Sequence, residues 1–199
     1  MEYRTLGRTG IRVSAIAFGA GPVSGWMDGL SPDAQCAVIQ RALDLGINWF
    51  DTAAGYGNGQ SEAGLGRLGM RRMTLLQLHN SYGNIMADCA AQRMGVFAIR
   101  VFAGGALLGA PPSAHTLKTP FFPLALYERD ARRAGALAAL LPAGLSMQAA
   151  ALRFALAHPH VTSALAGFRT PAEVDQAVSA LFSPPLPDEL LAAIGGGRQ

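Results

Sequence analysis

The sequence predicts an α/β fold, a parallel barrel of alternating strands and helices, and three observations indicate it. Short apolar runs end in polar or glycine-rich loops, as at Asp51 and at Gly104-Gly105. Apolar residues at helical spacing follow several of these runs. Half of the 199 residues are apolar and only 15% are charged, enough for a large buried core. Strand–helix alternation with polar residues after the strands is typical of a TIM-type barrel, whose chemistry lies at the carboxyl ends of its strands.

The first elements form a β-hairpin and one strand–helix–strand unit. Strands are expected at residues 3–6 and 11–13, around a turn bounded by glycines. A strand at residues 15–19 leads to a helix in which Ser31 is the N-cap and Pro32 the first helical residue. Gly46 ends this helix, and a strand at residues 47–50 follows directly. Such a unit implies parallel strands, because the helix returns the chain to the same end of the sheet.

The rest of the chain continues the alternation. We expect helices starting near Ser61 and at residues 85–93, 124–141, 146–158 and 172–181, and strands at residues 75–78, 96–99 and 162–166; prolines then break the tail. No internal repeat or linker divides the sequence, so residues 1–199 are expected to form a single domain. An open doubly wound sheet stays an alternative, although Gly19-Ala20-Gly21 lacks the further glycine of a GxGxxG fingerprint.

Composition narrows the classes of partner. The net charge is +3, carried by scattered arginines and a single lysine, which argues against a nucleic-acid surface and suits an anionic, phosphate-bearing small ligand. Cys36 and Cys89 show no spacing suited to zinc, so no metal site is expected. No apolar run reaches the ~18–20 residues that cross a bilayer, and no signal peptide is evident. We therefore expect a cytoplasmic protein without membrane contact.

Three side chains that handle protons follow two of the predicted strands. Asp51 and Tyr56 lie on one loop, and His79 ends the strand at residues 75–78. A phenol, with a pKa near ~10, holds its proton at neutral pH and can give it to a developing alkoxide. Gly104 and Gly105 would let backbone N–H groups approach a phosphate, and Arg169 before a helix is a second phosphate candidate.

These stretches together resemble the aldo-keto reductase family. The likeness rests on the hairpin Tyr3-Arg4-Thr5-Leu6-Gly7-Arg8-Thr9-Gly10 and on Phe50-Asp51-Thr52-Ala53-Ala54-Gly55-Tyr56-Gly57 with Ser61-Glu62 after it. It rests also on Leu75-Leu76-Gln77-Leu78-His79, on the glycine-rich loop Ala103-Gly104-Gly105-Ala106-Leu107-Leu108-Gly109, and on the segment from Ala157-His158-Pro159 through Gly167-Phe168-Arg169-Thr170-Pro171. The resemblance implies an eight-stranded barrel that binds NADP(H) without GxGxxG and transfers a hydride between the nicotinamide and a carbonyl carbon.

The resemblance also implies roles for single residues. Tyr56 matches the general acid, His79 the histidine that orients the carbonyl, and Asp51 the acid of the catalytic tetrad. The cofactor would be held by residues of two segments, namely Gly104, Gly105, Leu107, Gly167, Arg169 and Glu173. Ala177 stands where the family often has an asparagine against the adenine, so that contact is expected to be missing.

The sequence departs from the family in its length. The tetrad lysine belongs at the end of a third strand, but only 18 residues separate Tyr56 from residue 75, too few for another strand between two helices. Five or six strands are expected where a closed barrel needs eight. Lys118, on the long loop after residues 96–99, is a conceivable replacement for the missing lysine. Missing strands leave open edges, through which the chain could associate with itself.

Two functions from different classes follow. The first is an NADP(H)-dependent oxidoreductase that reduces aldehyde or ketone carbonyls, with turnover weakened by the missing lysine. Without that cation the pKa of a buried Asp51 is expected to rise. The alternative is a non-catalytic relative that binds NADP(H) and acts as a structural or regulatory partner. The residues do not identify the substrate.

Overall fold

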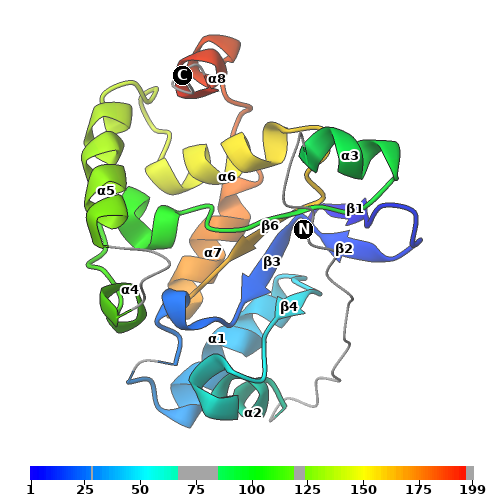
Figure 1. Ribbon diagram of the computed structural model, residues 1–199, viewed down its shortest axis with the longest axis vertical. Coiled ribbons are helices and arrows are strands. Elements are labelled where there is room, and N and C mark those ends of the chain that lie inside the picture. Colours follow the sequence, from blue (N-terminus) through cyan, green and yellow to red (C-terminus); the bar gives the residue numbers. More distant parts are fainter. Residues whose placement is uncertain (28, 67–84, 119–123, 196–199) are drawn as a thin grey trace.

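Four parallel strands form the central sheet of this protein. A computed structural model describes residues 1–27, 29–66, 85–118 and 124–195. The strand order is β4 (Phe50–Asp51), β3 (Ile16–Gly19), β6 (Ser163–Ala166) and β5 (Phe97–Ala98), and all three pairings are parallel (Figure 1). These are four of the five clear strands that the sequence predicts. The fifth, at residues 75–78, lies outside the described residues.

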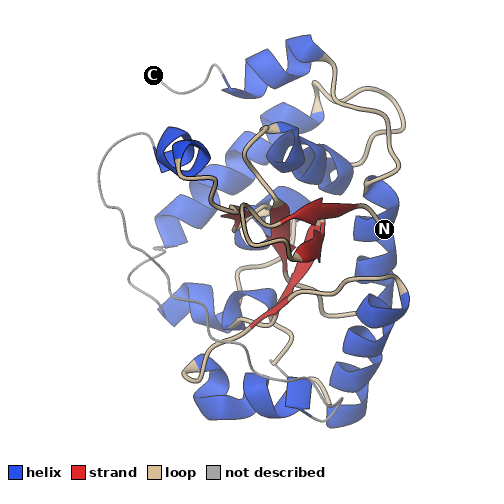
Figure 2. Cartoon of the chain, turned by 90° about the vertical axis from the view of Figure 1, so that its right-hand side faces the viewer, coloured by secondary structure: helices blue, strands red, loops and turns tan. Residues whose placement is uncertain are grey.

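Helices surround this sheet (Figure 2). They are α1 (Pro32–Asp44), α2 (Gln60–Gly66), α3 (Ile85–Ala91), α4 (Ala114–Lys118), α5 (Leu124–Ala138), α6 (Met147–Ala157), α7 (Pro171–Ala180) and α8 (Asp188–Gly195). Ser31 caps α1 by accepting a hydrogen bond from the Ala34 N–H, and Pro32 opens the helix, both as predicted. Gly46 follows the end of α1 with φ 87°, a left-handed conformation that glycine adopts without strain.

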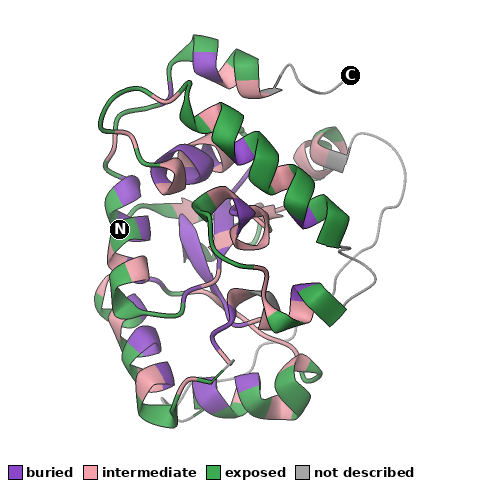
Figure 3. Ribbon diagram, turned by 90° about the vertical axis from the view of Figure 1, so that its left-hand side faces the viewer, coloured by how far each residue is buried: buried purple, intermediate pink, exposed green. Residues whose placement is uncertain are grey.

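The apolar core lies between the sheet and these helices. Phe18 of β3 is fully buried and contacts three aromatic rings, those of Trp26, Phe50 and Phe168. The same cluster includes residues of α1, α6 and α7. The two central strands, β3 and β6, are almost entirely buried, whereas the outer faces of the helices are exposed (Figure 3). The predicted α/β fold is therefore confirmed as an incomplete barrel.

On the face of the sheet that points away from Phe18, one aromatic residue from each edge of the sheet meets the other. Trp49 precedes β4, Phe97 opens β5, and their ring centroids are 5.1 Å apart. Flat strands about 4.8 Å apart would place the two edges some 14 Å from each other, so the sheet must curl. Ala15, Ala17 and Ser163 lie on this face and are fully buried, and the half-buried Leu165 lies there beside Ala17. The three small side chains leave space on this face for Leu165 and the two rings.

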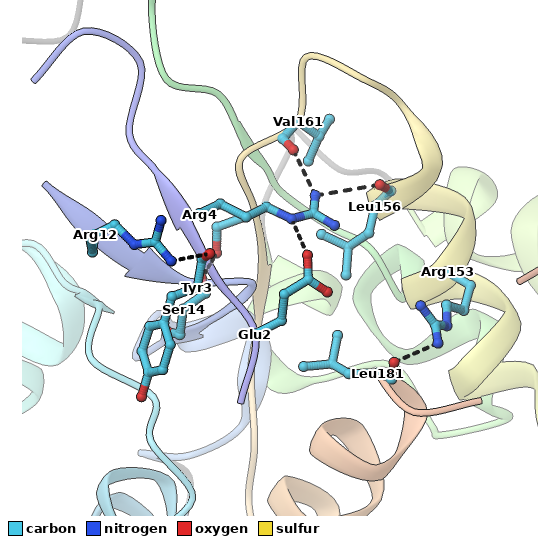
Figure 4. Close-up of polar contacts among 10 residues, drawn as sticks. Glu2, Tyr3, Arg4, Arg12, Ser14, Arg153, Leu156, Val161 and Leu181 are labelled. Carbon is cyan, nitrogen blue, oxygen red and sulfur yellow. Dashed lines mark hydrogen bonds and ion pairs between the residues drawn. The ribbon is translucent and has the colours of Figure 1, made fainter. Parts of the chain in front are cut away.

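A hairpin of β1 (Tyr3–Thr5) and β2 (Arg12–Ser14) packs at the amino ends of the strands. Arg4 donates from Nη1 to the Val161 carbonyl at 3.0 Å and from Nε to the Glu2 carboxylate at 2.8 Å, which ties β1 to the segment before β6 (Figure 4). Asn48 accepts from the Ser14 N–H at 2.8 Å and donates to the Arg12 carbonyl at 2.9 Å. Asn48 thus binds the hairpin, and β4 starts at residue 50 rather than at the predicted residue 47.

Two helices occur where the sequence predicts only loop. α4 lies inside the predicted long loop at residues 109–122, and α8 occupies the tail that the prolines were expected to break. Pro187 directly precedes α8, and Asp188 and Glu189 occupy its first turn, where carboxylates favour the positive end of a helix. This pattern was a signal for a helix start. In the described part of the chain, no helix combines the length and the apolar character that a membrane crossing requires.

Candidate active site

The candidate site lies at the carboxyl ends of the four strands, where four loops meet. The loop after β3 contains a short 3-10 helix, η1 (Pro22–Ser24), and it contacts each of the other three loops. It contacts Tyr56 after β4 through Gly21, and it contacts η3 (Ala103–Leu108) after β5. It reaches the loop after β6 through Ser24 and Gly25. The β3 loop is thus the centre of the site.

Tyr56 and Asp51 lie together at this end, as the sequence predicts. Asp51 ends β4, Tyr56 begins η2 (Tyr56–Gly59), and both side chains are half-buried. The Tyr56 ring packs on Gly21, where a built Cβ would lie 3.4 Å from Cε2 and 3.6 Å from Cζ. Because Gly21 has no side chain, the phenol ring of Tyr56 can lie directly against its backbone.

Electrostatics couple the two groups. Burial raises the pKa of Asp51, because a half-buried carboxylate is less well hydrated in its charged form than one in water. The pKa of Tyr56 is also raised, first by burial and then by the negative charge of Asp51, which opposes a phenolate nearby. Neither shift has a cationic contribution from the described residues. Tyr56 thus keeps its proton at neutral pH and is a weaker acid than a free phenol.

Arg169 extends the site on the β6 side. Its side chain is exposed and lies against Gly25, where a built Cβ would stand 3.1 Å from Cδ and 3.2 Å from Nε. Its backbone N–H donates to the Glu173 carboxylate at 2.7 Å, and Thr170 caps α7 by accepting from the Glu173 N–H. Glu173 therefore stabilises the start of α7 through both its carboxylate and its backbone N–H. Gly21 and Gly25 are four residues apart, so their Cα atoms lie at most about 14 Å from each other. Tyr56 contacts the first of these two glycines, and Arg169 contacts the second.

Gly167 allows β6 and the β3 loop to approach each other. A Cβ at Gly167 would lie 2.3 Å from the Ser24 Cβ and 3.0 Å from its Cα, which real side chains do not tolerate. The glycine-rich segment η3 is bent in a similar way: Gly104 and Gly105 have φ 69° and 97°. Leu107 lies half-buried in the same segment. These left-handed glycines turn backbone groups in directions that a regular helix does not offer.

Lys118, the conceivable substitute for the tetrad lysine, lies on a helix near the β3 loop. It ends α4, a helix that contacts η1, but its side chain is exposed. It contributes to neither the Asp51 nor the Tyr56 pKa shift. His79 lies outside the described residues, so its position relative to Tyr56 stays a prediction. Ala177 is fully buried in the core.

Two glycines of the β3 loop contact site residues, and neither contact was predicted from the sequence. Gly21 contacts the Tyr56 ring and Gly25 contacts the Arg169 side chain, yet neither glycine is among the site residues predicted from the sequence. Gly25 has φ 67°, but no sequence pattern distinguishes a glycine needed for a turn from one needed for a close contact. Their position directly after a buried strand was the available signal.

The arrangement matches known proteins in fold and in sequence. A family model described as Aldo/keto reductase family matches residues 15–75 and 71–196. The two matched ranges overlap at residues 71–75. Among solved structures, the aldo-keto reductase AKR11C1 from Bacillus halodurans (holo form) superposes with a TM-score of 0.71, over 98% of this chain and 96% of that one, at 17% identity. This likeness concerns the fold.

Curated relatives match a smaller part. The L-galactose dehydrogenase of Arabidopsis thaliana is 43% identical over 95 residues, which is 48% of this chain and 28% of that protein. A probable voltage-gated potassium channel subunit beta of Oryza sativa subsp. japonica is 40% identical over 76 residues, 36% of this chain and 23% of that protein. The match thus spans about a quarter of each relative's length. Since the family model covers most of the sequence, this chain belongs to the aldo/keto reductase family.

Proposed function

We propose that this chain is an NADP(H)-dependent oxidoreductase of the cytoplasm that reduces the carbonyl group of small aldehydes or ketones slowly. The observation that carries the proposal is the protonated phenol of Tyr56, held beside Asp51 in the loop cluster that also presents Arg169. Family membership supports the reaction type.

Tyr56 is the proton donor in this proposal. Reduction of a carbonyl places negative charge on its oxygen, and a phenol at that oxygen supplies the proton that completes the alcohol. Asp51 stands behind the phenol as the family's tetrad acid, and His79 is proposed to orient the carbonyl. Bound NADPH supplies the hydride. Tyr56 is expected to recover its proton from solvent, because its loop is partly exposed.

The residues present fit the phosphate-bearing cofactor. Arg169 offers an exposed guanidinium at the start of α7, where the helix dipole adds positive potential. The proposed set also includes Gly104, Gly105, Leu107 and Gly167, whose loops contact η1, while Glu173 acts indirectly by holding the Arg169 backbone. Arg169 is proposed to bind the 2′-phosphate that distinguishes NADPH from NADH.

Slow turnover follows from the charges at Tyr56. A nearby cation would lower the pKa of the phenol, whereas burial and Asp51 raise it here. A weaker acid transfers its proton less readily, and loss of one such charged group commonly costs ~10²–10⁴-fold in rate. Measurable but low activity is therefore the expected behaviour.

Steady-state NADPH oxidation with a panel of aldehydes tests the assignment. Tyr56→Phe should abolish turnover and leave NADPH binding within about twofold. Tyr3→Phe is a matched control, because the Tyr3 hydroxyl donates to the Gly46 carbonyl near the hairpin, at the other end of the strands. Activity that survives Tyr56→Phe would remove the assigned acid.

The second candidate is a non-catalytic NADP(H)-binding partner protein. The raised pKa of Tyr56 favours it, and so does the relative whose name is that of a potassium channel subunit beta. Calorimetric titration with NADPH beside the activity assay separates the two functions. Micromolar binding without turnover by the parent chain selects the partner role, and no detectable binding of NADPH overturns both.

A further inference from the structure

Two hydroxyl groups connect the ends of the loop that carries Tyr56. Ser61, in the first turn of α2, is fully buried, and its Oγ lies 2.9 Å from the Ala20 carbonyl oxygen. The Thr52 Oγ1 lies 2.7 Å from the Ser61 Oγ. Thr52 directly follows Asp51, and Ala20 directly precedes Gly21 on which the Tyr56 ring packs. The contacts therefore join the parts of the chain that position Asp51 and Tyr56.

The direction of these hydrogen bonds is fixed by elimination. A carbonyl oxygen only accepts, so Ser61 must donate its single hydroxyl hydrogen to Ala20. The 2.7 Å contact then leaves Thr52 as the donor and Ser61 as the acceptor. A third bond, from the Ala20 N–H to the Asp51 carbonyl at 2.9 Å, completes a ring through Ala20, Asp51, Thr52 and Ser61. We name this ring of three hydrogen bonds the Ser61 clasp.

The loop between the two hydroxyl groups has little regular structure of its own. Gly57, Asn58 and Gly59 all have positive φ, of 58°, 52° and 90°. Successive left-handed residues break the helical hydrogen-bond pattern, so the conformation of this loop depends on how its ends are held. Thr52 and Ser61, nine residues apart, hold them. Bonds in series polarise one another, which strengthens the ring as a unit.

We propose that Ser61 and Thr52 are positioning residues that fix Tyr56 and Asp51 relative to the β3 loop. Neither hydroxyl reaches the reacting atoms in this scheme, and both act through the loop they close. A buried serine that only capped α2 would bond a backbone N–H of its own helix, whereas Ser61 bonds β3 and the β4 loop. The consequence for chemistry rests on the proposed function, but the geometric role does not.

The test follows the Tyr56 phenol by NMR, with carbon-13 at the tyrosine ζ carbon and no cofactor present. The Tyr56 resonance is the one absent from Tyr56→Phe. In the parent chain its titration midpoint should lie above that of an exposed phenol, because burial and Asp51 raise the pKa. Thr52→Val, which keeps the shape and removes the donor, should lower the midpoint toward that of an exposed phenol. Thr52→Ser, which keeps the donor, should restore it.

Ser61→Ala should lower the midpoint further, since it leaves both Ala20 and Thr52 without their partner. Exchange of the Ala20 amide should be roughly tenfold faster in Ser61→Ala than in the parent chain. Ser146→Ala is the matched control: it removes a serine cap from α6 and lowers stability without contacting this loop. If Ser61→Ala does not fold, the two Thr52 variants decide the question.

The proposal falls if Thr52→Val leaves the Tyr56 titration unchanged while lowering thermal stability as Ser146→Ala does, because the hydroxyls would then be structural only. It stands if Thr52→Val moves the titration and Thr52→Ser restores it. Failure of the chain to bind NADPH would overturn the proposed function alone, since no step of this test uses the cofactor.

Discussion

Gly167→Ala should distort the site from within, because its Cβ would collide with the β3 loop. The Ser24 Cβ would be 2.3 Å away, and Ser24 would have to retreat by about 1.1 Å to reach an ordinary contact of 3.4 Å. Rotation of a side chain does not relieve this clash, because the Ser24 Cα is also too close, at 3.0 Å. The backbone of η1 must move, and Gly21 and Gly25 move with it.

Overpacking of this kind costs about 1–3 kcal/mol, and in a chain of this size each kcal/mol lowers Tm by roughly 2–4 °C. Chemical and thermal unfolding followed by circular dichroism measure this cost. Isothermal titration with NADPH should show a Kd at least about tenfold higher than in the parent chain, because misplacement by about 1 Å weakens a positioned site.

Gly135→Ala provides the control. Gly135 lies within α5 with open space around its Cα, so alanine there should stabilise the helix by up to about 1 kcal/mol and leave NADPH binding unchanged. If Gly167→Ala and Gly135→Ala have the same stability and the same NADPH affinity, the predicted clash is refuted, because a methyl group would then fit between β6 and the β3 loop.

Three further predictions concern the carboxylate, the curled sheet and the cofactor. The folded-state pKa of Asp51 lies above its ordinary 3.8, so the cost of its ionisation is absent below that value, grows as pH rises toward the folded pKa and stays constant above it. Asp51→Asn should therefore raise the free energy of unfolding at pH 7, by less than at a fully buried site because solvent screens a half-exposed carboxylate. Urea unfolding at pH 3 should no longer detect this gain. Trp49→Ala should cost roughly 2 kcal/mol, less than the loss of a fully buried aromatic, and sedimentation should show self-association if the edges of the sheet open. Arg169→Ala should raise the Kd for NADPH about tenfold and leave that for NADH unchanged, whereas equal losses for both would exclude a 2′-phosphate contact.

The main elements of the fold were predictable because their signals are local. The Ser31-Pro32 start of α1 and the alternation of short apolar runs with helices follow from neighbours in sequence, and the structure confirms them. The placement of Asp51 and Tyr56 at one end of the sheet followed from the rule that parallel strands present their carboxyl ends together. These inferences require no knowledge of distant contacts.

The contact between the two edges of the sheet was not predictable in this way. Trp49 and Phe97 are distant in sequence, and their rings meet across the four strands. Whether the shortened barrel closes does not follow from the sequence, because the contact between these rings depends on how the strands are ordered. Gly21 and Gly25 raise the same difficulty, since their neighbours Tyr56 and Arg169 come from two other strands.

The most direct test of the central claim is a titration of the labelled chain with NADPH, read at the Tyr56 ζ-carbon resonance. The claim is that a phenol and a guanidinium meet at one site for a reduced dinucleotide. A saturable change in that resonance is expected, with a midpoint that moves to about tenfold higher NADPH in Arg169→Ala. A Tyr56 resonance that does not respond when NADPH binding is complete would contradict it.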